Sequence, residues 1–289
     1  MNKNISTAIN TSTNAFSAAI KIFTSKRSGI IAAASCLALG WLTGCEKVID
    51  LKLNNAEAQY VIEGNVSNRA FEPAEVKISK TKNFNDDNNF IGVSGANVGI
   101  KVNNGTSYNL TESATGVYRN AALKGVPGNT YTLNVSVDGK DFSGTSTMPS
   151  QIVPLDTIFV ADEVFAGSTL KTVRPSFLDP VGLGNSYRFI QYNNNVQVKK
   201  VFVQNDELSD GLNLPFPLFD DDTKLKSGDS VRLNMLCLDR FMYKYWFSVE
   251  ESATGQGEST PTNPVTNIVG GALGYFSAHS VTSKAVIVP

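Results

Sequence analysis

Short segments in which apolar and polar side chains alternate fill residues 58–148, and turn residues separate each segment from the next. Alternation with a period of two predicts strands that bury one face and expose the other. A new strand every roughly 8–12 residues is typical of a small Greek-key sandwich. The sequence therefore predicts an Ig-like β-sandwich domain over residues 45–148. Its expected strands are 58–66, 75–80, 96–102, 107–110, 116–120, 130–138 and 141–148.

Several turns in this half have a chemical cause. Residues 103–105 (Asn-Asn-Gly) and 138–139 (Asp-Gly) tolerate the positive φ values that tight hairpins require. Residues 125–128 (Gly-Val-Pro-Gly) force a reversal ahead of the strand at 130–138. The turns and the strands therefore agree with each other.

The second half of the chain repeats the β pattern with longer elements. Residues 149–154 contain two prolines and no periodicity, so we place a linker there. Residues 155–289 then predict a second β-rich domain with one helix, which makes the whole fold mostly β. Its expected strands are 155–165, 172–177, 186–192, 196–204, 229–238 and 281–288. Adjacent Gly270 and Gly271 predict a bulge or a close approach of two backbones.

Residues 240–251 carry the pattern of a helix, with Asp239 available as N-cap and Gly255 beyond the end. Its apolar stripe consists of Met242, Tyr245, Trp246 and Val249. The segment holds more aromatic residues than one buried stripe needs, which makes Tyr243 and Phe247 candidate interface residues on the outside. The interpretation that we favour is that the helix lies between two layers that bury all of these aromatics.

A proline-broken apolar stretch at residues 212–219 surrounds Phe216. It is interpreted either as a docking loop, with Phe216 as an interface residue, or as a covered sheet edge.

An apolar stretch at residues 30–42 follows Lys-Arg at 26–27 and runs into Leu-Thr-Gly-Cys at 42–45. It is shorter than the roughly 20 residues that span a bilayer and matches the apolar region of a signal peptide. Small residues directly before a cysteine predict a lipoprotein signal peptide over residues 1–44 and acylation of Cys45. Two or three fatty acyl chains, such as palmitate, anchor a protein stably in membrane lipid. The alternative is an ordinary cleaved signal with an incidental cysteine.

Charge and cysteine content exclude some functions of the mature chain. The sequence has 25 basic and 26 acidic residues, and cleavage after residue 44 removes Lys3, Lys21, Lys26 and Arg27 but no acid. The resulting acidity argues against nucleic acid as a partner. Cys45 and Cys237 are the cysteines that remain. Because Cys45 is expected to carry lipid, no intramolecular disulfide is available, and alternation over 231–237 favours Cys237 as a core residue rather than a reactive thiol.

The sequence offers few residues for catalysis, and we expect no enzyme, metal or cofactor. His279 is the only histidine, which prevents a two-histidine metal site within one chain, and a solitary histidine near a strand end is usually structural. Residues 83–88 begin like a calcium loop, but Asn88 and Ser94 replace its glycine and glutamate. The aspartates at 220–222 are interpreted as a solvated loop. The alternative is an enzyme whose carboxylates lie far apart in the sequence.

Several short motifs, in this order, resemble one protein family. They are Cys-Glu-Lys-Val-Ile-Asp-Leu at 45–51, Val-Ile-Glu-Gly at 61–64, Val-Ser-Gly-Ala-Asn-Val at 93–98, Gly-Val-Tyr at 116–118, Gly-Asn-Thr-Tyr-Thr-Leu at 128–133 and Asn-Ile-Val-Gly-Gly-Ala-Leu-Gly-Tyr-Phe at 267–276. The chain thus resembles domain-of-unknown-function family 4249, lipoproteins of Bacteroidetes-type bacteria. Members are commonly encoded beside TonB-dependent outer-membrane transporters. The resemblance implies an accessory role in nutrient uptake and supplies no catalytic or binding residues.

If this origin holds, Asp-Thr-Ile at 156–158 and Asp-Ser-Val at 229–231 resemble periplasmic O-glycosylation sites, with Thr157 and Ser230 as acceptors. Plain strand starts are the alternative. We therefore expect a non-catalytic lipoprotein, anchored through Cys45 in outer-membrane lipid, that works with a TonB-dependent transporter. A structural or adhesive surface module is the alternative function. The sequence leaves open whether the protein faces the medium or the periplasm.

Overall fold

Strands from both predicted halves join in one sheet of 13 strands, in the order β11-β10-β13-β15-β1-β2-β5-β4-β3-β6-β7-β14, with β12 paired to β10. A hairpin, β8-β9, forms a second sheet. The structure is a computed structural model that describes residues 57–289 apart from 83–89, 166, 221, 223 and 255–262. The elements are β1 (Tyr60–Ser67), β2 (Ala74–Lys80), β3 (Asn97–Val102), β4 (Ser107–Ala114), β5 (Val117–Asn120), β6 (Thr130–Val137), β7 (Lys140–Thr147), β8 (Thr157–Phe165), β9 (Ser168–Ser176), β10 (Ser186–Asn193), β11 (Val196–Gln197), β12 (Phe202–Asn205), β13 (Ser230–Cys237), α3 (Arg240–Thr254), β14 (Ile268–Val269) and β15 (Leu273–Ile287).

Strands β1 to β7 fold into a sandwich around a first apolar core. β1 supplies Ile62, β6 supplies Leu133 and β15 supplies Phe276, all of which are buried. The alternating burial along β1 and β6 is the period of two seen in the sequence. The prediction of a mostly-β fold with an Ig-like sandwich and one helix near the C-terminus is confirmed.

A second apolar core lies between the β8-β9 hairpin and strands β10 and β13. Phe189 of β10 and Leu233 of β13 pack here with Val173 of β9. Cys237, at the end of β13, is buried in this core, and burial raises the pKa of its thiol. The interpretation of Cys237 as a core residue is confirmed.

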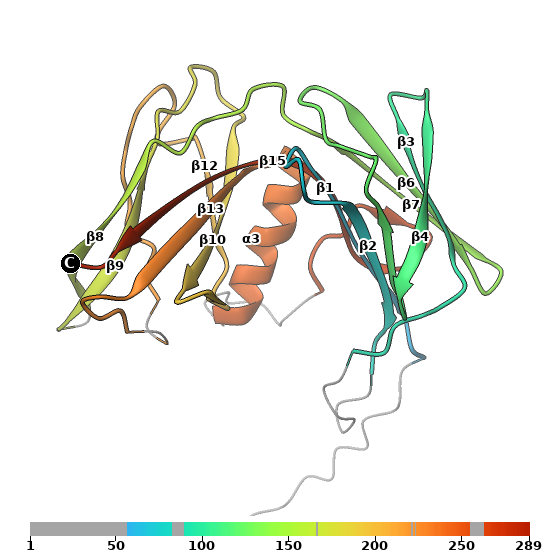
Figure 1. The fold of residues 1–289 in the computed structure, drawn as a ribbon, viewed down its shortest axis with the longest axis horizontal. Helices are drawn as coiled ribbons and strands as arrows, with labels where there is room; N and C mark the ends of the chain where they lie inside the picture. The colour runs from blue at the N-terminus through green and yellow to red at the C-terminus, as the bar shows by residue number, and fades with distance from the viewer. Residues whose placement is uncertain (1–56, 83–89, 166, 221, 223, 255–262) are drawn as a thin grey trace, which may run out of the picture. The chain divides into compact units, whose positions relative to one another are not determined.

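β15 belongs to both cores. Its residues 273–279 pair in parallel with β1, and residues 280–287 pair antiparallel with β13 (Figure 1). The predicted second domain at 155–289 is therefore wrong at its C-terminal end, because residues 268–279 pack in the first core. The predicted linker at 149–154 does fall between β7 and β8. The error arose because the continuous strand crosses from one core to the other without a break in its pattern.

The backbone confirms the predicted turns. Asn103, Asn104 and Asp138 have φ values of 47°, 58° and 49°. Gly270 has a φ of 106°, and a Cβ at this position would lie 2.5 Å from the carbonyl oxygen of Asp141. The predicted close approach of backbones is therefore found at Gly270.

Helix α3 begins as predicted at Arg240 and extends beyond the predicted residue 251 to Thr254. Asp239 is its N-cap, because its Oδ1 accepts a hydrogen bond from the backbone N–H of Met242 at 2.8 Å. Met242 is 1% exposed. Gly255 lies outside the described residues. No helix in the described part of the chain is long and apolar enough to span a bilayer.

Candidate functional site

The two faces of the central strands differ in chemistry. Ile62 and Gly64 of β1 point into the first core, whereas Glu63 between them points to the other face. In register with Glu63 are Tyr275 of β15 and Lys77 of β2. Helix α3 contacts β10, β12 and β15 (Figure 1). The face opposite the first core thus carries polar side chains beside a third, smaller apolar cluster under α3, formed by Leu236, Leu238, Met242 and Tyr275.

A cavity of about 440 Å³ opens on this face. Glu63, Glu72, Glu75, Lys77, Arg188 and Tyr275 are among the residues that line it. The lining residues come from β1, β2, β10, β11, β13 and β15 and from the β1-β2 connection. We call it the Arg188–Glu63 cavity. Its size falls within the range of small-molecule sites, about 300–1,000 Å³.

Arg188, which lines the cavity, stacks on an aromatic side chain of α3. Its guanidinium carbon lies 3.3 Å from the centroid of the Trp246 ring, which itself packs against Tyr275 at 5.0 Å. This cation–π contact fixes the orientation of the guanidinium. Burial lowers the pKa of Arg188 to about 10, so the group stays charged at pH 7. Among the described residues the guanidinium has no ion-pair partner, and its buried Nε has no hydrogen-bond partner.

The carboxylates around Arg188 differ in their partners. Glu75 forms an ion pair with Arg119 at 2.6 Å, and Glu72 accepts a hydrogen bond from the Ser67 hydroxyl at 2.7 Å. The half-buried Glu63 carboxylate makes neither kind of contact with any other described residue. Glu63 and Arg188 therefore stand as an unpaired carboxylate and an unpaired cation in one cavity.

His279 also lines the cavity, and its ring is buried. Burial, followed by the positive charges of Arg188 and Arg69, lowers the pKa of His279 to about 3, so the ring is neutral at pH 7. Its Nδ1 lies 2.9 Å from the hydroxyl oxygen of the buried Ser277. Within the described residues no carboxylate is hydrogen-bonded to this ring. A Ser-His-Asp triad is therefore not assembled around this histidine.

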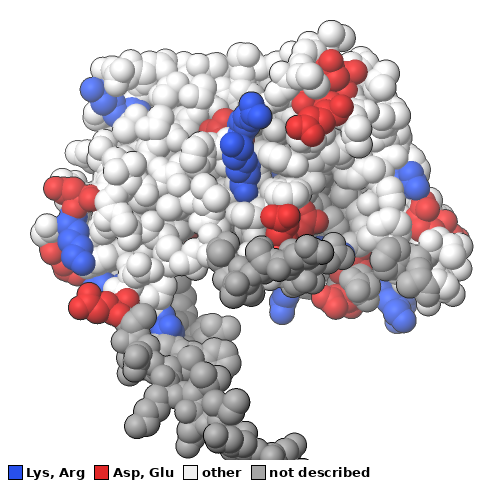
Figure 2. Space-filling view, turned by 180° about the vertical axis from the view of Figure 1, so that it is seen from behind, with Lys and Arg blue, Asp and Glu red and all other residues white. Residues whose placement is uncertain are grey.

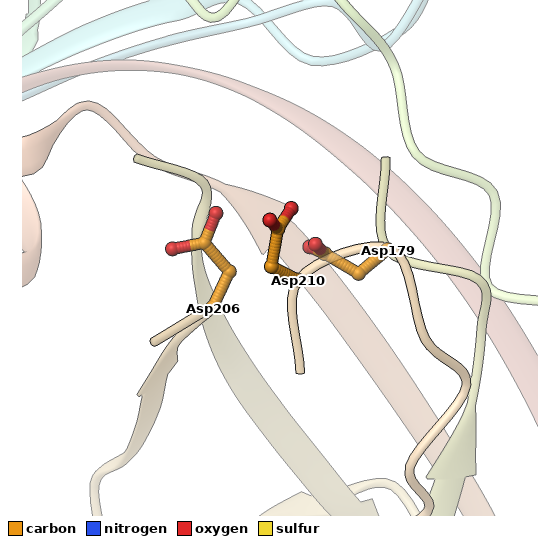
Figure 3. Close-up of side chains that lie close together, drawn as sticks. All are labelled: Asp179, Asp206 and Asp210. Carbon is orange, nitrogen blue, oxygen red and sulfur yellow. The ribbon is translucent and has the colours of Figure 1, made fainter. Parts of the chain in front are cut away.

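A second polar cluster brings together Asp179, Asp206 and Asp210, each of which offers a carboxylate oxygen within 4.8 Å of the others. Figure 3 shows Asp210 between Asp206 and Asp179. Asp179 and Asp206 are buried, and none of the three forms an ion pair with a described Lys or Arg. Such oxygen ligands suit a hard divalent cation. The sequence shows no contiguous ligand motif for this cluster, because Asp179 lies between β9 and β10, whereas Asp206 and Asp210 lie in one turn after β12.

These carboxylates also hold the loops around them. Asp206 accepts backbone N–H groups from Gly184 and Asn185, each at 2.8 Å. Asp179 accepts the Tyr187 hydroxyl at 2.5 Å, and burial together with this bond raises the pKa of Tyr187. The cluster therefore stabilises the loops of this fold.

The predicted calcium-like loop at 83–88 lies outside the described residues.

The candidate interface residues of α3 are partly exposed. Phe247 is 41% exposed and stacks on Tyr243 with ring centroids 5.8 Å apart. Phe241 is 46% exposed, so the favoured interpretation, in which two layers bury every aromatic side chain, is wrong. Phe216 instead packs edge-on against Phe189 at 5.3 Å, at the margin of the second core. This contact favours the covered-edge interpretation of residues 212–219.

The predicted modification sites fall in different places. Thr157 and Ser230, at the first positions of β8 and β13, are both exposed. Their exposure meets a requirement of O-glycosylation, which stays a prediction. Cys45 lies outside the described residues.

On the face that Figure 2 shows, acidic and basic side chains are interspersed.

Comparisons with known proteins place the sequence in a family. The family model described as Domain of unknown function (DUF4249) matches residues 46–285. A two-domain fibronectin type-III segment of chicken tenascin is similar at 14% identity, covering 63% of this chain and 91% of that one with a TM-score of 0.21. The adhesin InvE of Yersinia pseudotuberculosis is similar at 19% identity, covering 62% and 55% with a TM-score of 0.18. No curated protein matches. Because the family model covers most of the sequence, the chain belongs to the DUF4249 family.

Proposed function

We propose that the protein is a non-catalytic binding lipoprotein of the outer membrane, anchored through acylated Cys45, and an accessory component of a TonB-dependent nutrient-uptake system. The observation that carries the binding role is the Arg188–Glu63 cavity, in which a cation and a carboxylate lack partners among the described residues. Protein folds rarely leave a buried charged group unpaired unless a ligand completes it.

The anchor is supported by the sequence around Cys45. An apolar stretch at 30–42 leads into Thr-Gly-Cys at 43–45, and the family match begins at residue 46. The match thus starts directly after the predicted lipid-bearing residue. The non-catalytic assignment is supported by His279, the sole histidine, whose ring is buried and neutral.

Membrane fractionation of Cys45→Ser tests the anchor, with Cys237→Ser as the matched control because Cys237 is buried in the second core. We expect the wild-type protein and Cys237→Ser to stay in the membrane fraction and to carry fatty acyl chains detectable by mass spectrometry. Cys45→Ser should leave the membrane fraction. Equal anchoring of Cys45→Ser would contradict lipidation at this residue.

Affinity purification of the tagged protein from outer membranes tests the partner. A TonB-dependent transporter should be recovered in stoichiometric amount. Recovery without any transporter would instead favour the alternative of a structural or adhesive surface module. Protease treatment of intact cells then separates the two orientations, since only a surface-facing protein is digested.

A further inference from the structure

The Arg188–Glu63 cavity contains donors without acceptors. Arg188 presents a planar guanidinium with five N–H donors, and its ring contact with Trp246 leaves these donors directed along the plane of the group. Among the described residues none accepts a hydrogen bond from it. A carboxylate is the group whose two oxygens match this fork.

The same cavity contains an acceptor without donors. An ionised glutamate accepts hydrogen bonds and donates none, and the Glu63 carboxylate has no donor among the described residues. The Tyr275 hydroxyl, in register with Glu63 on the neighbouring strand, accepts a 3.4 Å hydrogen bond from Asn65 Nδ2 and forms none with Glu63. A ligand that pairs with Glu63 therefore supplies its own N–H or O–H groups.

The charges of the lining limit the charge of the ligand. Three glutamates, at 63, 72 and 75, face the cavity with Lys77 and Arg188. Lys77 already lies 3.4 Å from Glu75, which leaves Arg188 as the cation without a counter-ion. A phosphate with two negative charges would be repelled by these carboxylates, whereas a single carboxylate would pair with Arg188.

We propose that the Arg188–Glu63 cavity binds a small monocarboxylate solute whose carboxylate pairs with Arg188 and whose ammonium or hydroxyl groups donate to Glu63. The inference rests on the proposed function as a binding lipoprotein and names the ligand class of that site. Two sources share this chemistry: amino acids or short peptides, and sugar acids.

Titration calorimetry on the protein purified from its own membranes tests the inference independently of the anchor and the transporter. The probes are alanyl-alanine, glucuronate, glucose as the uncharged counterpart, and inorganic phosphate. We expect one of the two carboxylates to bind at least about tenfold more tightly than glucose and phosphate. Binding of the dipeptide identifies an amino-acid or peptide site, and binding of glucuronate identifies a sugar-acid site.

Substitutions then assign the binding to the cavity. Arg188→Lys keeps the positive charge but loses the planar pair of N–H donors that matches a carboxylate. We expect the affinity for the carboxylate probe to fall about tenfold or more. Glu63→Gln should weaken binding by a similar factor. The matched controls Arg240→Lys and Glu207→Gln change exposed residues that do not line the cavity and should bind like the wild type.

Three results would overturn the inference. They are no carboxylate binding at about 10 mM ligand, equal binding of glucose or phosphate, and unchanged binding in both cavity variants. If Arg188→Lys fails to fold, as judged by its melting curve, the binding affinity of Glu63→Gln tests the inference instead. This variant should fold, because Glu63 has no intramolecular partner to lose among the described residues.

Discussion

Tyr275 and Phe276 are neighbours in β15 and face opposite sides of the central sheet. Phe276 is fully buried in the first apolar core, whereas Tyr275 lines the Arg188–Glu63 cavity beside Trp246. The period of two along a strand thus gives consecutive residues different tasks. One face supplies the packing that stabilises the fold, and the other keeps charged groups available for a ligand.

Phe276→Ala should produce the largest loss. Removal of a fully buried phenyl ring leaves a cavity in the core, and we expect a decrease of about 3–5 kcal/mol in the free energy of unfolding. The matched change on the other face, Tyr275→Phe, removes a hydroxyl with one long hydrogen bond and should cost less than about 1 kcal/mol. Denaturant unfolding measures both. Similar losses would show that the two faces contribute equally to stability.

Asp239→Ala should have an intermediate effect and reports how α3 is joined to the sandwich. One carboxylate oxygen caps the helix, and the other accepts the Ser146 hydroxyl of β7 at 2.5 Å. Loss of the cap and of this bond should lower the free energy of unfolding by about 1–2 kcal/mol. Asp239→Asn keeps a capping oxygen and should retain most of the stability. If Asp239→Ala unfolds at the same denaturant concentration as the wild type, the hydrogen bonds of Asp239 to α3 and β7 do not stabilise the fold.

These contrasts also show which features are encoded locally. Alternation along residues 58–66 and 130–138, turn residues such as Asn103, and the N-cap Asp239 act over a few residues, and all three correctly predicted their elements. A local pattern predicts that a strand exists, but long-range packing decides which strand it pairs with. The parallel pairing of β1 with β15 joins opposite ends of the described chain, and no local sequence pattern predicts it.

The candidate site was missed for the same reason. Glu63 and Arg188 share a cavity because β1 and β10 belong to one sheet, and neither residue lies in a recognisable motif. The three aspartates of the second cluster likewise meet because the β9–β10 connection, with Asp179, lies beside the turn after β12, with Asp206 and Asp210. The excess of aromatic residues over one helical stripe made exposure of Tyr243 or Phe247 one of two interpretations, and the packing of α3 decides in favour of an exposed Phe247.

Glu112 is a carboxylate with several hydrogen-bond donors, in contrast to Glu63, which has none among the described residues. Hydrogen bonds from the Ser94 hydroxyl, and then from the Gly116 and Gly95 N–H groups, lower the pKa of Glu112 below its usual 4.5. A lowered pKa in the folded state means that Glu112 stabilises the protein above about pH 4.5, and that this contribution disappears as the pH falls through the folded-state value.

We therefore expect Glu112→Gln to be less stable than the wild type at pH 7 and to lose less stability between pH 7 and pH 3. Melting curves across this pH range measure the difference. Glu63→Gln, compared at pH 7 alone, should melt like the wild type, because no described donor is lost. Parallel pH profiles of Glu112→Gln and the wild type would show that the Glu112 hydrogen bonds do not stabilise the fold.

Phe247→Ser should have the smallest effect on stability. The Phe247 ring is partly exposed and stacks on Tyr243, whereas Met242, one residue before Tyr243 in the same helix, is buried against β13 and β15 residues. A surface substitution of this kind changes the free energy of unfolding by about 0.5 kcal/mol or less, whereas Met242→Ala should cost about 2–5 kcal/mol. Denaturant unfolding of both variants compares the two sides of α3 directly. A large loss in Phe247→Ser would mean that its side of α3 is also a packing surface, and the ring would then no longer be available to a partner.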